Sequence, residues 1–230
     1  RPDSVFADLV NLIVELGKCE FTPMAKFIIA RRAASSASTS ANKAANGSEW
    51  RTALVTGMRQ GGTGYFAMDV TDPSDSGYPA YGWDFPGEAD TNSTSDPDSV
   101  RPYLGESWSK PILTKVRVRV DGNDNAGKGF ERWVMVIGGG FDDSGDPNNA
   151  ADYNSTAIAG RSILIVDIKT GKLLAMKRYL PGAPATDPQR LMKYAISSTP
   201  AVFDLNSDGF ADVIYSGDLG GQIFKWVISP

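Results

Sequence analysis

The sequence WVMVIG, residues 133–138, is a short apolar run that ends in a glycine. Two other runs share this pattern, TALVTG at 52–57 and DVIYSG at 212–217. Their closing glycines, Gly57, Gly138 and Gly217, are spaced 81 and 79 residues apart. A fixed period of this length indicates a structural repeat, in which each unit packs on its neighbours.

The segments around each run complete the repeating unit. A Gly-rich turn and then a second apolar run follow each glycine, and in the second unit an Asp/Asn-rich insertion separates the two runs. The second runs are YFAMDV (65–70), ILIVDI (163–168) and IFKWVI (223–228). Pro111 and Pro200 open the first strands of the second and third units, before the strands that end in glycine. Thr170-Gly171 joins ILIVDI to KLLAMKRY as a tight hairpin. Four antiparallel strands per unit form the blade of a β-propeller.

We therefore predict an all-β chain with two to three four-stranded blades within residues 50–230, and a β-sandwich is the alternative. Closed propellers have roughly four to eight blades, so this count falls short of a ring. Residues 1–32 are predicted as a separate N-terminal segment, with a short helix over 4–17. Residues 33–49, rich in Ala, Ser and Asn, are predicted as a linker or long loop. The start at Arg1 and the incomplete last blade suggest part of a longer protein.

Composition excludes several classes of function. The chain has 230 residues with 23 Lys+Arg and 27 Asp+Glu, so no net basic field is available for nucleic acid or an anionic membrane. It contains no His, which excludes histidine-based triads and His-ligated zinc within this chain, and its single Cys excludes an internal disulfide. No run reaches the roughly 18 apolar residues that a membrane span needs.

The sharpest chemical motif is DLNSDGFAD at residues 204–212, which fits the pattern D-x-N-x-D-G-x-x-D. Oxygen ligands at the first, third and fifth positions curl around a hard cation, and glycine at the sixth permits the sharp turn. The candidate ligands are Asp204, Asn206, Asp208, Asp212 and the backbone carbonyl of Phe210. Because the donors are numerous oxygens on a flexible loop, Ca²⁺ is favoured over Mg²⁺. A purely polar Asx turn is the alternative.

Other motifs are weaker. Asp121-x-Asn123-x-Asn125 and Asp142-x-Ser144-x-Asp146 are incomplete copies of the loop, and each is interpreted as a solvated loop. Residues 122–128 match the start of a phosphate-binding loop, but no helix follows, so a hairpin loop is favoured. Three N-x-S/T sequons begin at residues 46, 92 and 154 and are interpreted as chance matches in polar loops.

The tryptophans are a further candidate, because they can line a sugar or cofactor site. We instead expect them to fill the space between blades, where large aromatic side chains bury most area. They are Trp50, Trp83, Trp108, Trp133 and Trp226.

Several longer motifs together resemble the PilY family of type IV pilus tip proteins, over most of residues 49–229. They are WRTALV (50–55), GGTGYFAMDVTDP (61–73), LGESWSKP (104–111), STPAVFD (198–204) and GDLGGQ (217–222). The resemblance implies the C-terminal propeller of a large secreted protein at the pilus tip. It also implies that the loop matching Asp204–Asp212 binds calcium through the five ligands named above.

The function implied by this resemblance is pilus assembly, extension and retraction, and surface adhesion, without catalysis. The implied partners are minor pilins at the tip, and a host or abiotic surface bound through regions outside this chain. Two alternatives share the propeller: a quinone-dependent dehydrogenase, which also uses calcium, and an integrin-like ligand-binding propeller. A single Cys does not allow the adjacent-cysteine pair often found over the quinone, and the integrin-like reading expects the loop in several blades.

Overall fold

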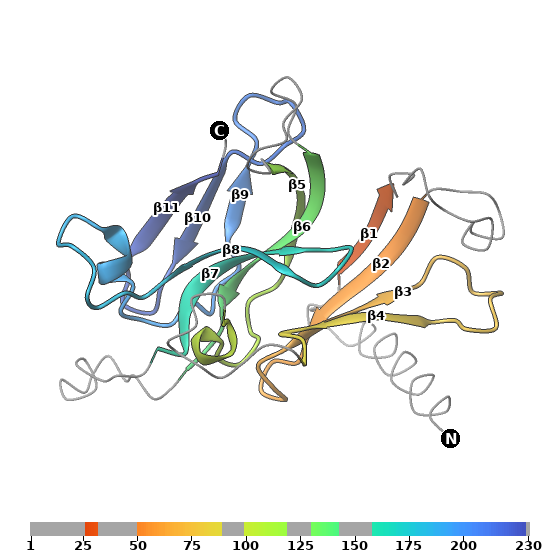
Figure 1. Cartoon of the computed structure of the whole chain (residues 1–230), viewed down its shortest axis with the longest axis horizontal. Coiled ribbons are helices and arrows are strands. Elements are labelled where there is room, and N and C mark those ends of the chain that lie inside the picture. The colour runs from red at the N-terminus through yellow and green to blue at the C-terminus, as the bar shows by residue number, and fades with distance from the viewer. Residues whose placement is uncertain (1–25, 32–49, 89–98, 119–129, 143–157, 229–230) are drawn as a thin grey trace.

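The structure, a computed structural model, describes residues 26–31, 50–88, 99–118, 130–142 and 158–228 (Figure 1). The helix predicted over 4–17 and the linker predicted over 33–49 lie outside these ranges. In the described residues, η2 (Arg101–Tyr103) and η5 (Pro188–Leu191) are short 3-10 helices. Within the described ranges, none of the helices has the length and apolar character needed to cross a bilayer.

Three antiparallel sheets follow one another along the chain and lie side by side in that order (Figure 1). Each sheet pairs its strands in sequence order. The first contains β1 (Lys26–Arg31), β2 (Trp50–Gly57), β3 (Tyr65–Asp69) and β4 (Ala80–Phe85). The second contains β5 (Ile112–Val118), β6 (Phe130–Gly139), β7 (Gly160–Asp167) and β8 (Leu173–Arg178). The third contains β9 (Ala201–Phe203), β10 (Val213–Gly217) and β11 (Ile223–Val227).

The strand register confirms the predicted repeat. Ala53 pairs with Asp69, Val134 with Asp167, and Val213 with Val227. The repeat glycines therefore occupy equivalent positions, at the last residue of β2 and β10 and one residue before the last of β6. The β7–β8 hairpin is also as predicted, and Gly171 adopts a φ of 69° in its turn. One strand was not anticipated: β1 pairs with β2, so the first sheet starts before Trp50.

The core lies between the sheets, in two layers. Residues of β6 alternate between them: Met135 and Ile137 pack toward the first sheet, while Val134 and Val136 pack toward the third. All four are fully buried, which explains why WVMVIG is continuously apolar and not alternating. Sheets stacked face to face in this way are propeller blades, and the chain is a partial β-propeller.

Three of the four tryptophans with described side chains have the expected packing role, whereas Trp108 donates its indole N–H to Glu106 Oε2 at 2.8 Å and lies in neither core layer. Trp83 and Trp133 contribute to the layer between the first and second blades, and Trp226 to the layer between the second and third. The indole N–H of Trp83 donates to the carbonyl of Ile168 at 2.6 Å, so its polar group is satisfied inside the core.

The segments that lead into β5 and β9 tie consecutive blades together. The Ser109 hydroxyl, fully buried, accepts from the Gly138 amide at 2.8 Å and donates to the Ser198 carbonyl at 3.0 Å. Ser198, the equivalent residue one blade later, donates to the Gly217 carbonyl at 2.9 Å. The glycines at the ends of β6 and β10 are therefore the points at which each connecting segment is anchored.

Candidate metal centre

The loop Asp204–Asp212 joins β9 to β10 in the third blade and also contacts the second. Its base is closed by the Asp212 amide, which donates to the Phe203 carbonyl at 2.9 Å. Its far side is bound to β5, because the Ala211 amide donates to the Lys115 carbonyl at 2.8 Å. The loop thus lies at the junction of two blades. The sequence motif alone does not predict this position.

Two left-handed residues fold the loop into a tight coil. Gly209 has a φ of 84° and Ser207 a φ of 61°. Glycine is required most at the sixth motif position because L side chains are strained there, whatever space surrounds them. The coil turns the preceding amides inward, toward the side chains of the first half of the motif.

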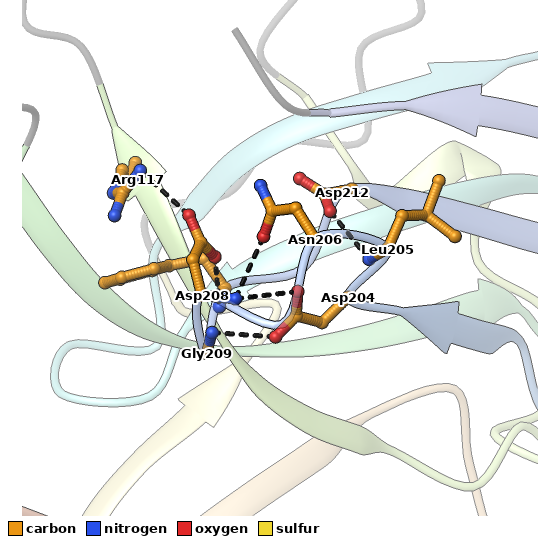
Figure 2. A network of polar contacts seen from close by, with 8 residues as sticks. Arg117, Asp204, Leu205, Asn206, Asp208, Gly209 and Asp212 are labelled. Carbon is orange, nitrogen blue, oxygen red and sulfur yellow. Dashed lines mark hydrogen bonds and ion pairs between the residues drawn. The ribbon is translucent and has the colours of Figure 1, made fainter.

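Those inward amides are bound by the predicted ligand side chains (Figure 2). The Asp208 amide donates to Asn206 Oδ1 at 2.9 Å and to Asp204 Oδ1 at 3.2 Å. The Gly209 amide donates to Asp204 Oδ2 at 2.7 Å. Asp204 therefore binds the loop with both of its oxygens, which holds its carboxylate over the centre of the turn.

The second half of the motif follows the same principle. The Phe210 amide donates to Asp208 Oδ1 at 3.0 Å, and the Leu205 amide donates to Asp212 Oδ2 at 2.7 Å. Asp212 is 8% exposed, so its carboxylate is buried against the loop. The structure thus brings all five predicted positions into one coil, with four oxygen-bearing side chains on it.

Two cations of β5 face this loop, and sequence reasoning missed both. Arg117 Nη1 lies 3.0 Å from Asp208 Oδ2, and its guanidinium lies 4.2 Å from the centre of the Phe210 ring. Lys115 Nζ lies 4.6 Å from the same ring centre. The alternating run Lys-Val-Arg-Val predicts that both side chains leave one face of a strand, but it does not indicate which loop they meet.

The donor set fits a hard divalent cation. Carboxylate, amide and carbonyl oxygens are the ligands that Ca²⁺ takes, six to eight at a time. A hollow of about 280 Å³ adjoins the loop and is lined in part by Asn206, Asp208 and Asp212. Arg117 already places one positive charge on Asp208. The three aspartates are not preassembled as a metal cluster, and the described parts of the chain contain no cluster of three or more acidic or cysteine side chains arranged to hold a metal.

Other sequence candidates are not brought to this site. Residues 119–129 lie outside the described ranges, and with them the copy at Asp121 and the phosphate-loop match. The same holds for residues 143–157 and for the three sequons. Asp142, the first residue of the other copy, is described and half-buried at the end of the second blade's β6 segment.

A larger hollow of about 460 Å³ lies between the first and second blades. Trp83 and Trp133 line it, and the Arg51–Asp69 ion pair at 3.2 Å stands at its edge. Asp69 is also held by the Thr71 amide at 2.9 Å, so this carboxylate serves the turn after β3.

Comparison with known proteins gives a consistent result. The family model described as the PilY1 beta-propeller domain matches residues 33–229. A type IV pilus biogenesis factor PilY1 of Pseudomonas aeruginosa PAO1 is 31% identical over 181 residues, which cover 78% of this chain and 12% of that protein. A PilY1 homolog of Xylella fastidiosa is 30% identical over 183 residues, covering 78% of this chain and 10% of that protein.

A solved structure, the C-terminal domain of Pseudomonas aeruginosa PilY1, aligns with a TM-score of 0.49 at 26% identity. The alignment covers 88% of this chain and 29% of that one. The chain therefore spans about a tenth of the length of the curated relatives that it matches.

Proposed function

Because the chain belongs to the PilY1 β-propeller family, we propose that it is the calcium-binding propeller segment of a protein that acts in type IV pilus biogenesis. The observation that carries the calcium proposal is the folded motif itself. Asp204, Asn206, Asp208 and Asp212 lie on a single coil with Gly209 left-handed, and Phe210, whose carbonyl is the fifth predicted ligand, belongs to the same coil.

Calcium would hold the loop in one conformation. It supplies concentrated positive charge that relieves the repulsion among three carboxylates on nine residues. This chain's part is to hold the loop between β9 and β10 and against β5, so that fixing the loop also fixes a contact between two blades. At free calcium near 100 times Kd, the gain in folding free energy is about 2.7 kcal/mol.

The wider role that we propose belongs to the whole protein. It acts at the pilus tip, outside the cell, in assembly, extension and retraction, and in surface adhesion. Its proposed partners are minor pilins, together with host or abiotic surfaces bound through regions outside this chain. The relatives are named as biogenesis factors, which supports a non-enzymatic role.

The calcium proposal is tested by thermal unfolding with and without CaCl₂. Calcium is expected to raise the Tm of the wild-type protein by about 5–10 °C, from the gain above and the usual 2–4 °C per kcal/mol for a chain of this size. Asp208→Asn keeps the shape of the side chain but removes its charge, and it should abolish most of this rise.

Asp75→Asn provides the matched control. Asp75 is exposed and accepts from the Gly77 amide at 2.9 Å, so it forms a similar Asx turn outside the candidate site. Its variant should retain the full calcium response. A calcium response that persists in Asp208→Asn would place the ion elsewhere and refute the assignment. In the intact protein, Asp208→Asn should reduce surface pili, whereas Asp75→Asn should not.

A further inference from the structure

The side chain of Arg117 stands where it must affect any cation that binds the loop. It comes from β5 of the second blade, whereas every candidate ligand belongs to the third (Figure 2). Its Nη1 lies 3.0 Å from Oδ2 of Asp208, the oxygen of that carboxylate that is not bound to the Phe210 amide. Arg117 therefore uses the oxygen of Asp208 that is otherwise available to a metal.

We propose that Arg117 is a built-in counter-cation of the loop, which competes with calcium for Asp208 and so lowers the calcium affinity. This inference rests on the proposed calcium function of Asp204–Asp212. Without calcium, the guanidinium offsets part of the negative charge on the loop and keeps Asp208 in place. A calcium ion bound through Asp208 would need the oxygen that Arg117 now contacts, so the two cations would compete for it.

The packing around Arg117 makes this exchange feasible. The guanidinium lies 4.2 Å from the Phe210 ring centre, so a cation–π contact holds the side chain beside the loop even without Asp208. The strand register places Glu131 of β6 directly opposite Arg117. Cross-strand neighbours lie on the same face of a sheet, so the negative charge of Glu131 also favours a guanidinium that stays on this face of β5.

The size of the effect follows from charge and distance. Calcium binds carboxylate oxygens at 2.3–2.6 Å. An ion on Asp208 Oδ2 would then lie within about 5–6 Å of the guanidinium nitrogen that now contacts this oxygen. Repulsion between a single and a double positive charge at about 6 Å in water corresponds to about tenfold in a binding constant.

Calcium titration calorimetry on the purified protein tests this inference. Arg117→Gln and Arg117→Met both remove the charge, and Met also keeps an unbranched apolar stem against Phe210. Each should bind calcium about tenfold more tightly than the wild type. Arg117→Lys keeps a positive charge and should remain within about threefold of the wild-type affinity.

Arg132→Gln is the matched control. Arg132 also lies on the second blade, is 43% exposed against 45% for Arg117, and pairs with an aspartate, Asp167, that lies outside the loop. Its variant has the same net charge as Arg117→Gln but should leave calcium affinity unchanged.

The outcomes separate the two proposals. If the wild type binds calcium and both neutral variants bind it equally or more weakly, Arg117 is not a competitor and this inference fails alone. The same conclusion follows if Arg132→Gln tightens binding as much as Arg117→Gln, because the effect is then one of net charge. If neither the wild type nor the neutral Arg117 variants bind calcium, the calcium function fails and this inference fails with it.

Discussion

The end of β6 offers a sharp test of how the blades are held together. A Cβ added at Gly138 would lie 2.3 Å from the Ile196 carbonyl oxygen and 2.8 Å from its Cγ2. Ordinary contacts of a Cβ begin near 3.4 Å, so Gly138→Ala requires the connecting segment to move by about 1 Å. Ile196 is fully buried, and its carbonyl also accepts from the Gly140 amide at 3.1 Å.

These contacts set the expected magnitude. Overpacking of a tight interior costs about 1–3 kcal/mol, and weakening the hydrogen bond to Ile196 adds about 0.5–1.5 kcal/mol. Alanine loses less backbone entropy than glycine on folding, and this offsets about 0.5–1 kcal/mol of the cost. Gly138→Ala should therefore lower the free energy of unfolding by about 2–3 kcal/mol, with a decrease of about 4–12 °C in Tm.

The repeat supplies the control for this prediction. Gly217 is the equivalent residue of the third blade, but the nearest atom to its added Cβ is the Gln222 carbonyl oxygen at 3.8 Å. Gly217→Ala should be neutral or slightly stabilising, because only the entropy term applies. Urea unfolding gives the free energy of unfolding of both variants and tests this difference. Equal losses at the two sites would show that the strand position itself, and not the close approach of Ile196, requires glycine.

Two further predictions concern the buried polar contacts between blades. Ser109→Ala leaves the Gly138 amide and the Ser198 carbonyl without their hydroxyl partner. This variant should lower the free energy of unfolding by about 1–3 kcal/mol. A loss of less than about 0.5 kcal/mol would indicate that water replaces the hydroxyl. The Tyr65 hydroxyl donates to the Ser109 carbonyl at 2.8 Å, and burial raises the pKa of Tyr65 above its ordinary value of 10.0. Since its pKa is higher in the folded state, its contribution to stability is complete below pH 10 and declines above it, by up to about 1.4 kcal/mol per pH unit. Tyr65→Phe should flatten this alkaline decline, and an unchanged slope in pH-dependent unfolding would assign the decline to other groups.

The blade pattern was accessible from sequence because its signals are local. Strand ends at Gly57, Gly138 and Gly217, the hairpin at Gly171 and the entry prolines each reflect backbone preferences of a few neighbouring residues. The loop motif is local in the same sense, because D-x-N-x-D-G requires only that nine consecutive residues coil together. These features needed no knowledge of the rest of the chain.

Contacts between segments that are distant in the sequence depend on tertiary packing. The placement of β1 beside β2 spans residues 32–49, whose composition offers no pairing signal. The approach of Arg117 to Asp208, and of Ile196 to Gly138, joins residues more than fifty positions apart. Such contacts are set by how whole blades stack, and packing of buried faces carries no periodicity that a short window of sequence can show. Local sequence therefore predicts the repeating strand and the coiled D-x-N-x-D-G-x-x-D loop, whereas blade packing sets which cations face that loop and how closely Ile196 approaches Gly138.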